Sequence, residues 1–352
     1  AGGSVHRNGG SYGGVGGPGS SDNFANAVYG AYFDPDEPGS GGGSDGGPGG
    51  SGGGVVRITA SHIALDGQIL ANGGNGSTYA GGGSGGAIGI NTVSFSGLGQ
   101  ITANGGDAGN QSGGGGGGRI ALYYGSLSGF DLANLRADGG IGASIGGTGT
   151  IYTREGTNAA VIVVRGSAQE TPLPITHPDD HMIIDGAKVS STNLVLASLT
   201  LTNGAILTHP ATTGDLETRL ELNIGKLVIS TNSRIDVSAR GYLGGRSFGN
   251  GGDVGRTLGN TTVGGSTRRN GGSYGGLGAY GSTETTVNAS YGSYIDPNEL
   301  GSGGGTDTGT GGTGGGLLRI TANEVLLEGE IRANGGSGST YAGGGSGGGV
   351  RI

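Results

Sequence analysis

The 32 residues VVRITASHIALDGQILANGGNGSTYAGGGSGG, at positions 55–86, are followed without a gap by a second stretch of the same design. The second stretch starts AIGINTVSFSGLGQITANGG at position 87, and related phrases start at positions 119 and 317. Each phrase opens with alternating apolar and polar residues, which is typical of a half-buried β-strand, and closes with glycine. A strand phrase that returns at a fixed interval predicts a stacked repeat architecture.

Comparison of two of these phrases predicts which side of the strand faces a core. Successive side chains of a strand point to opposite faces, so residues at every second position share one face. The intervening residues, such as Gln68 and Glu330, differ between the phrases and are predicted to meet solvent. The apolar set, predicted to line the core, is Ile63, Leu65, Ile69 and Ala71 in one phrase and Val325, Leu327, Ile331 and Ala333 in the other.

The relation extends far beyond the strand phrase. With an offset of 262 positions, Arg7 aligns with Arg269 and the alignment runs without a gap to Ile90 against Ile352, with 54 identities in 84 pairs. Eleven residues, GSTYAGGGSGG, recur letter for letter, although a flexible linker would be free to drift. Because Ile352 matches a position inside a strand phrase, we expect the sequence to be part of a longer chain of tandem repeats.

Composition excludes several classes of function. The chain has 93 glycines in 352 residues, no cysteine and a net charge of -8. Without cysteine there is no disulfide framework and no thiolate site, and an acidic balance with 18 basic residues argues against a nucleic-acid partner. The longest apolar run, Ala159 to Val164, is far shorter than the ~20 residues that span a bilayer, so no membrane span is predicted.

These patterns predict an all-β chain with almost no helix. Short strands with one apolar face are expected to stack as a right-handed parallel β-helix, or β-solenoid, because parallel crossovers are right-handed. Six or seven coils in one period would advance roughly 29–34 Å at the spacing of paired strands. The predicted segments are a glycine-rich excursion at 1–54, glycine-interrupted coils at 55–153, glycine-poor coils at 154–239, a second glycine-rich excursion at 240–316 and the first coil of the next repeat at 317–352.

The order of the motifs resembles a known family. SYGG, a Y-x-D-P-like turn, GSGGG, RITA…LDGQILANGG, AGGGSGG and GGGGGGRIALYY follow one another as in glycine-rich parallel β-helix repeats of giant, secreted prokaryotic surface proteins. The resemblance covers nearly the whole chain and is weakest in 154–239. It implies a pectin-lyase-like right-handed helix at an extracellular or cell-surface location, with a structural or adhesive role. Carbohydrate-active enzymes share that fold, so the motifs specify fold better than function.

The glycine-rich segments must leave the coil and return to it. Polyglycine can form an extended threefold helix of the polyproline II type, and such helices can pack side by side with backbone hydrogen bonds between them. Similar bundles occur in the glycine-rich domains of the anaplastic lymphoma kinase receptor family, and we predict polyglycine II bundles here. Tyrosine rings are expected to cover the bare backbone, with sugar stacking as the alternative. The tyrosines that recur between the copies are Tyr12, Tyr29, Tyr32 and Tyr79, matched by Tyr274, Tyr291, Tyr294 and Tyr341.

Each coil ends in Ala followed by Asn or Asp and two glycines. Asn and Asp tolerate the left-handed conformation and glycine adopts it at little cost, so this motif predicts a corner turn. Stacked corners would also let the side-chain amides bond to one another along the stack. The corner residues are Asn72, Asn104, Asp138 and Asn334.

The turns FDPDEPG at 33–39 and IDPNELG at 295–301 keep two acidic residues in both copies. Carboxylates beside carbonyl-rich glycine loops suit a hard cation such as calcium. Asp-Pro is also an ordinary turn opener, so both interpretations stay open, and no other cofactor is predicted. The candidate calcium ligands are Asp34, Glu37, Asp296 and Glu299.

The stretch THPDDH, at 176–181, is the one dense cluster of residue types used in catalysis. In an extended segment Asp179 and Asp180 would point to opposite faces, whereas cleavage of a polysaccharide needs carboxylates that converge. We therefore predict a non-enzymatic, structural repeat of an extracellular filament or giant cell-surface fibre, which continues in tandem or self-associates along the fibre axis. The alternatives are a polysaccharide-active β-helix enzyme, lyase or hydrolase, and an adhesin that binds glycans or another cell, with extracellular polysaccharide as a partner.

Overall fold

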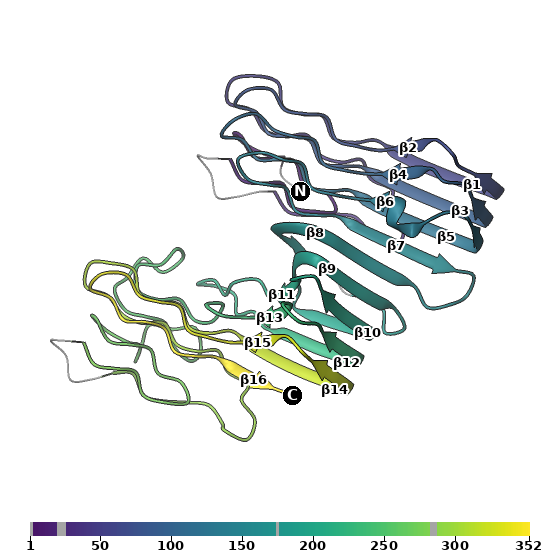
Figure 1. Ribbon diagram of the computed structural model, residues 1–352. Helices are drawn as coiled ribbons and strands as arrows, with labels where there is room; N and C mark the ends of the chain where they lie inside the picture. The colour runs from purple at the N-terminus through teal and green to yellow at the C-terminus, as the bar shows by residue number, and fades with distance from the viewer. Residues whose placement is uncertain (1–2, 20–25, 174–175, 282–286) are drawn as a thin grey trace.

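The computed structural model of the protein describes residues 3–19, 26–173, 176–281 and 287–352. The predicted all-β class is confirmed within these ranges, where the only helix is one 3-10 turn at Leu132–Asn134. The described ranges contain no helix whose length and apolar character would let it cross a bilayer. The rest is strand and extended glycine-rich backbone (Figure 1).

Most strands belong to one 13-stranded sheet. Its main path follows the strands β1 (Val55–Ala64), β3 (Ala87–Ser96), β5 (Arg119–Ser128), β7 (Thr150–Glu155), β8 (Val161–Pro172), β9 (His181–Ser190), β10 (Asn193–Thr202), β12 (Leu220–Ile229), β14 (Leu317–Leu327) and β16 (Gly349–Arg351). Three short strands, β11 (Ile206–Thr208), β13 (Arg234–Asp236) and β15 (Glu330–Arg332), pair beside that path. A second, three-stranded sheet contains β2 (Gln68–Leu70), β4 (Gln100–Thr102) and β6 (Leu135–Arg136).

The pairing register follows the interval read from the sequence. Val55 lies opposite Ala87, and Ala87 lies opposite Arg119, so β1, β3 and β5 stack in parallel at steps of 32 residues. A long strand, a turn and a short strand form one unit, and the glycine-rich stretch after the short strand leads to the next unit. The described residues before Val55 and between Asp236 and Leu317 contain no named strand.

The predicted core face is confirmed in the first copy. Ile63, Leu65 and Ile69 pack against a cluster that contains Ile101, and Ala71 is buried in it. Leu70, on the opposite face of its strand, is 51% exposed. The terminal unit of the second copy is less covered, because Leu327 at the predicted core face is 46% exposed.

The prediction of a wholly parallel sheet is wrong at one place. β7 and β8 form an antiparallel pair, with Ile151 opposite Val163 and Thr153 opposite Val161. The residues between these strands close a hairpin, so the chain returns along the strand it has just completed. All later pairs are parallel again, which means that strand direction through the sheet reverses once, at this hairpin.

The hydrophobic core lies on one face of the sheet before this hairpin and on the opposite face after it. Leu122 and Ile151 belong to one hydrophobic cluster, whereas their sequence neighbours Ala121 and Tyr152 belong to another. Sequence neighbours on a strand point to opposite faces, so the two clusters lie on opposite faces of β5 and β7. The first cluster continues back to β1, and the second continues through β8 to β14.

The number of stacked layers is larger than predicted. The path from β1 to β14 takes eight inter-strand steps instead of six or seven. The glycine-poor part has short units, since His181 of β9 lies opposite Ser198 of β10, with no glycine excursion between these strands. Eight steps correspond to an advance of about 38 Å, which replaces the expected 29–34 Å.

The glycine-rich stretch 81–86 is held on three sides by other segments. The backbone N–H groups of three successive residues donate to three different neighbouring segments. The next three residues donate to the same three segments in the same order. Such a period matches an extended helix with three residues per turn and no internal hydrogen bonds. The donor–acceptor pairs are Gly81 to Gly43 and Ser84 to Ser40, Gly82 to Gly113 and Gly85 to Gly116, and Gly83 to Gly74 and Gly86 to Ala71.

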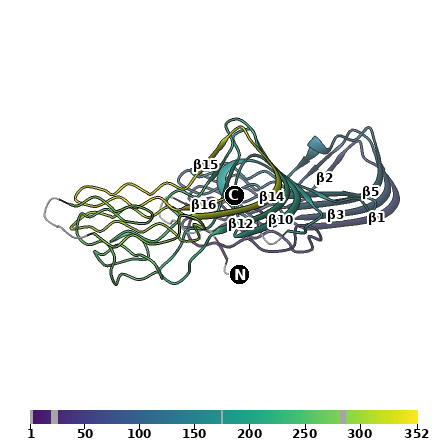
Figure 2. The same cartoon turned by 90° about the horizontal axis from the view of Figure 1, so that it is seen from below.

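Residues 113–118 repeat this arrangement with their own three neighbours. Successive residues thus face three neighbouring segments in turn, and a Cβ atom at Gly115 or Gly116 would lie 2.0 or 2.1 Å from a backbone carbonyl oxygen. In Figure 1 the glycine-rich segments of both copies extend to the same side of the strands, and Figure 2 shows those of the second copy from below. The pairs are Gly113 to Arg7 and Gly116 to Gly10, Gly114 to Ser144 and Gly117 to Gly147, and Gly115 to Gly106 and Gly118 to Ala103.

His209 is fully buried in the segment that follows β11. Its Nδ1–H donates to the Pro210 carbonyl oxygen at 2.8 Å, and its Nε2 atom has no hydrogen-bond partner. Burial lowers the pKa of His209 to about 4, and the charge of Arg240 acts in the same direction. The folded chain therefore holds this imidazole neutral over a range in which an exposed histidine takes up a proton.

We expect the free energy of unfolding to fall by about 3 kcal/mol as the pH is lowered from about 6.5 to about 4. Between about pH 6.5 and about pH 4 the unfolded chain protonates His209 and the folded chain does not. The contribution of His209 to the free energy of unfolding is therefore complete above about pH 6.5 and is lost as the pH falls toward about 4. Urea unfolding at several pH values checks this. His209→Asn, which keeps a donor near Nδ1 but cannot titrate, should lose this decline, whereas exposed His62→Asn should retain it. An unchanged decline in His209→Asn would contradict the assignment.

Candidate functional site

The recurring tyrosines pack against the glycine-rich segments in both copies. Tyr12 is fully buried, and its ring lies 4.9 Å from that of Tyr29, at a tilt of 51°. Tyr274 and Tyr291 repeat the pair at 5.2 Å and 56°. The Tyr29 hydroxyl donates to the Pro38 carbonyl oxygen, so both rings tie separate parts of an excursion together.

The other tyrosines divide into two groups. Tyr79 and Tyr341 each lie under an arginine, with the guanidinium carbon of Arg7 or Arg269 about 4.5 or 4.4 Å from the ring centre. Tyr32 is buried against Tyr152, whereas Tyr294, its counterpart in the second copy, is 95% exposed. Tyr79 and Tyr341 are 43% and 56% exposed despite their arginine contacts, so close packing is observed for Tyr12, Tyr29, Tyr32, Tyr274 and Tyr291.

Arg119 connects the first glycine-rich excursion to the sheet through hydrogen bonds. This role was not predicted from the sequence. Of the residues that the structure describes, Arg119 is the largest with a fully buried side chain, at 1% exposed. Its Nε and Nη2 donate to the Tyr29 carbonyl oxygen at 3.0 and 2.9 Å, and Nη1 donates to Thr150 Oγ1 at 3.0 Å. The guanidinium also lies 5.5 Å from the Tyr12 ring centre, so one cation bridges β5, β7 and the first excursion.

The carboxylates of the two Asp-Pro turns have arginine partners. Asp34 pairs with Arg57 at 2.8 Å, and Asp296 pairs with Arg319 at 3.3 Å and with Arg351 at 2.8 Å. Arg57 and Arg319 occupy matching positions in the two copies, so the same ion pair ties each turn to its strand.

The two glutamates of these turns lie in different surroundings. Glu37 Oε2 is buried without a hydrogen-bond partner, and burial raises the pKa of Glu299. The described ranges contain no group of three or more His, Cys, Asp or Glu side chains placed to hold a metal ion. The calcium site stays a prediction, and arginine supplies the counter-charge to both aspartates.

The corner residues form a ladder, but not the one predicted. Asn72 Oδ1 accepts a hydrogen bond from the Asn104 backbone N–H at 2.8 Å, and Asn104 Oδ1 accepts one from the Asp138 N–H at 2.8 Å. In the second copy the Asn334 N–H donates to Ser238 Oγ at 3.0 Å. The partner is therefore a backbone amide instead of a second side-chain amide, because the extended corner leaves its N–H pointing along the stack.

The left-handed conformation predicted for these corners is absent from all four residues. The chain passes directly from the short strand into the extended glycine segment there, so no reversal is required. Left-handed residues lie instead in the turn between the long and the short strand, as at Asn203 with φ 55° and Asn232 with φ 67°.

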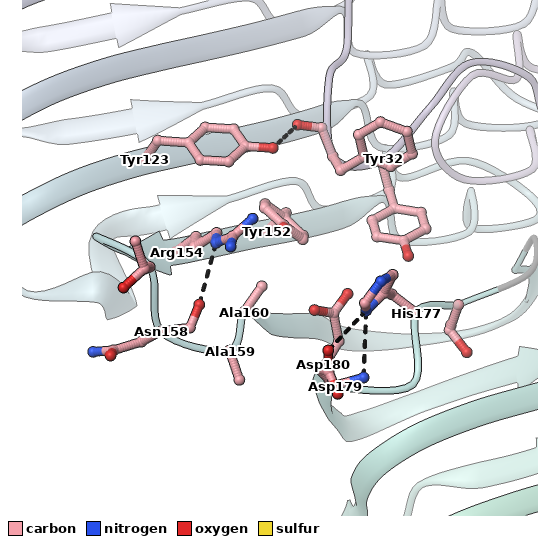
Figure 3. A pocket seen from close by; sticks show the side chains of 13 residues that line it. Tyr32, Tyr123, Tyr152, Arg154, Asn158, Ala159, Ala160, His177, Asp179 and Asp180 are labelled. Carbon is pink, nitrogen blue, oxygen red and sulfur yellow. Dashed lines mark hydrogen bonds and ion pairs between the residues drawn. The ribbon is translucent and has the colours of Figure 1, made fainter.

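A cavity of about 570 Å³ opens where the core changes face. Its walls come from the first excursion, from β5, from the β7–β8 hairpin and from the turn before β9; we call it the junction cavity. Figure 3 shows Tyr32, Tyr123 and Tyr152 along one side and His177, Asp179 and Asp180 along another. The cavity thus joins segments that are far apart in the sequence.

Three tyrosine rings line one side of the junction cavity. The Tyr152 ring lies 5.8 Å from Tyr32 and 5.4 Å from Tyr123, with tilts of 51° and 50°. The Tyr123 hydroxyl donates to the Phe33 carbonyl oxygen at 2.7 Å, which fixes its ring. Burial raises the pKa of Tyr32 to about 12, and the Asp180 carboxylate adds to the rise.

The polar side of the junction cavity contains one exposed and one buried carboxylate. The Asp179 side chain is 82% exposed and lies 3.8 Å from His177 Nδ1. Asp180 is only 7% exposed, and burial raises its pKa. Arg154 turns toward the hairpin, where its Nε donates to the Asn158 carbonyl oxygen at 3.2 Å.

Only part of this cavity could be predicted from the sequence. Tyr32 was selected because that residue recurs, and Asp179 and Asp180 were expected to point to opposite faces of an extended segment. Tyr123 and Tyr152 were missed, although each stands next to a core residue and so had to point away from the first core. Tyr123 and Tyr152 line the same cavity as Asp180 because the antiparallel β7–β8 hairpin brings these residues together.

Searches with the sequence and the structure found no matching family model, no matching curated protein and no matching solved structure.

Proposed function

We propose that this chain is a non-enzymatic, structural repeat of an extracellular fibre. In this proposal the strands on each side of the β7–β8 hairpin wind as a right-handed parallel β-helix, and the glycine-rich segments form a flanking bundle of polyglycine II helices. The extracellular setting rests on the resemblance of the motifs to repeats of secreted surface proteins.

One observation carries the proposal: the second copy extends the sheet of the first. β14, which opens the second copy, pairs in parallel with β12 from Leu220 opposite Leu318 to Ile229 opposite Leu327. Each copy can therefore act as the template for the next, as expected for a repeat protein whose units contact only their neighbours.

The glycine-rich segments continue across the same boundary. The Gly303 N–H donates to the Arg256 carbonyl oxygen, and the Gly314 N–H donates to the Tyr242 carbonyl oxygen. Strand pairing and glycine packing thus join the copies together, and both leave hydrogen-bonding groups directed along the stack. Pairing these edges in a fibre removes the exposed strands that otherwise invite irregular aggregation.

Polypeptides with added 262-residue periods should lengthen along one axis. We expect the largest dimension to grow by about 38 Å per period, since each period adds eight inter-strand steps. Small-angle X-ray scattering and electron microscopy measure the length, and the cross-section should stay constant. Growth in width at constant length would contradict end-to-end stacking, and an advance far from that value would contradict the layer count.

A further inference from the structure

We propose that the junction cavity binds an organic cation, namely a primary or quaternary ammonium group. This site is independent of the fibre proposal, since it lies inside one copy of the repeat. Tyr32, Tyr123 and Tyr152 would surround the apolar part of the group, and Asp180 would supply the counter-charge.

The buried carboxylate gives the cavity its preference for charge. Asp180 is 7% exposed and lies within ion-pair distance of no Lys, Arg or His of the described ranges. Burial raises its pKa and outweighs the charges of His177 and Arg154 and a hydrogen bond with the Ala160 backbone, which favour its ionised form. A buried ionised carboxylate without a counter-charge is costly, and a cationic ligand removes that cost. The basic side chains of the cavity are engaged elsewhere: His177 lies 3.8 Å from Asp179 at the rim, and Arg154 donates to the Asn158 carbonyl oxygen.

The aromatic wall fits a cation better than a sugar. A sugar ring stacks on one broad, exposed aromatic face, but Tyr32 and Tyr152 are each 5% exposed and tilt against their neighbours. Three tyrosine rings that line one cavity instead match the aromatic composition of sites for ammonium groups. A neutral sugar would also leave the charge of Asp180 uncompensated.

The volume is suited to a small organic group. A cavity of about 570 Å³ is within the range of small-molecule sites, which hold a few polar groups among apolar walls. The ammonium can belong to a free metabolite-sized molecule or to a lysine side chain of a polypeptide. The chemistry is the same in both cases, and the test below separates them.

The test uses the 352-residue chain and ligand-observed NMR titration. The probes are tetramethylammonium, N-acetyl-lysine methylamide, and two neutral compounds: tert-butanol, which has a similar shape to tetramethylammonium, and methyl glucoside. We expect binding of the cations and none of the neutral compounds. A lysine derivative that binds more tightly than tetramethylammonium points to a polypeptide as the source, and the reverse order points to a small ammonium compound.

Matched variants locate the site. Asp180→Asn keeps the shape of the side chain and should weaken cation binding by about tenfold or more, whereas exposed Asp215→Asn should leave it unchanged. Tyr123→Leu should weaken binding as well, and it keeps the test decisive if Asp180→Asn does not fold by circular dichroism. Equal binding of tert-butanol and tetramethylammonium, preference for methyl glucoside, or unaltered affinity in both folded variants would overturn the proposal.

Discussion

Valine at both Gly82 and Gly85 should disrupt the glycine-rich flank of the first copy. A Cβ atom at Gly82 would lie 1.9 Å from the Gly106 carbonyl oxygen, and one at Gly85 would lie 2.0 Å from the Ala103 carbonyl oxygen. Neither contact can be relieved by a side-chain rotation, because the obstacle is backbone. We expect a loss of about 3 kcal/mol or more at each site, with loss of the hydrogen bonds to residues 113–118.

The second copy provides a control within the same eleven-residue sequence. The counterparts are Gly344 and Gly347, where the nearest atoms to a Cβ lie at 3.5 and 3.6 Å, an ordinary contact distance. Valine at both should be tolerated in this polypeptide. Thermal unfolding and limited proteolysis of residues 73–118 compare the two double variants. Equal protease resistance of both would show that residues 81–86 act as a linker.

Ile101→Asp should unfold the first stack of strands. Ile101 is fully buried in β4, between Ile69 of β2 and Leu135 of β6. The substitution places an unpaired carboxylate in an apolar core and removes the packing of the isoleucine, so we expect a loss of several kcal/mol. The midpoint of urea unfolding measures the effect.

Gln100 is the matched control on the same strand. Its side chain is exposed and points to the opposite face of the sheet. Gln100→Asp should therefore change stability by no more than about 0.5 kcal/mol. Similar midpoints for Ile101→Asp and Gln100→Asp would refute the assignment of the core face.

Much of the local structure was determined by the sequence alone. The alternation around Ile69, the step of 32 residues and the start of strands at Val55 and Leu317 all agree with the structure. These features depend on local chemistry, because a strand with one apolar face shows a period of two wherever it occurs. The glycine stretches were also predicted to be ordered, since a sequence without constraint would not recur unchanged.

The candidate site was predicted less well. Tyr32 was selected because it recurs in the second copy, but recurrence did not reveal its neighbours. Arg119 gave no signal, since an arginine at the start of a strand is usually exposed, and only the excursion folded over it makes it buried. Asn72, Asn104 and Asp138 form a ladder, but Asn334 bonds to Ser238, and the hydrogen-bond partners depend on backbone direction, which a residue pattern does not contain.

Only the tertiary structure decided the direction of the strands and the side of the core after Glu155. The alternation of apolar and polar residues is the same in parallel and antiparallel strands. It also does not show on which face of the sheet the hydrophobic core forms. The hairpin between β7 and β8 reverses the chain, and the second core then forms on the opposite face of the sheet. That change brings Tyr123 and Tyr152, which point away from the first core, together with Asp180. The junction cavity therefore arises from long-range pairing, because its walls are contributed by residues whose contacts no local pattern specifies.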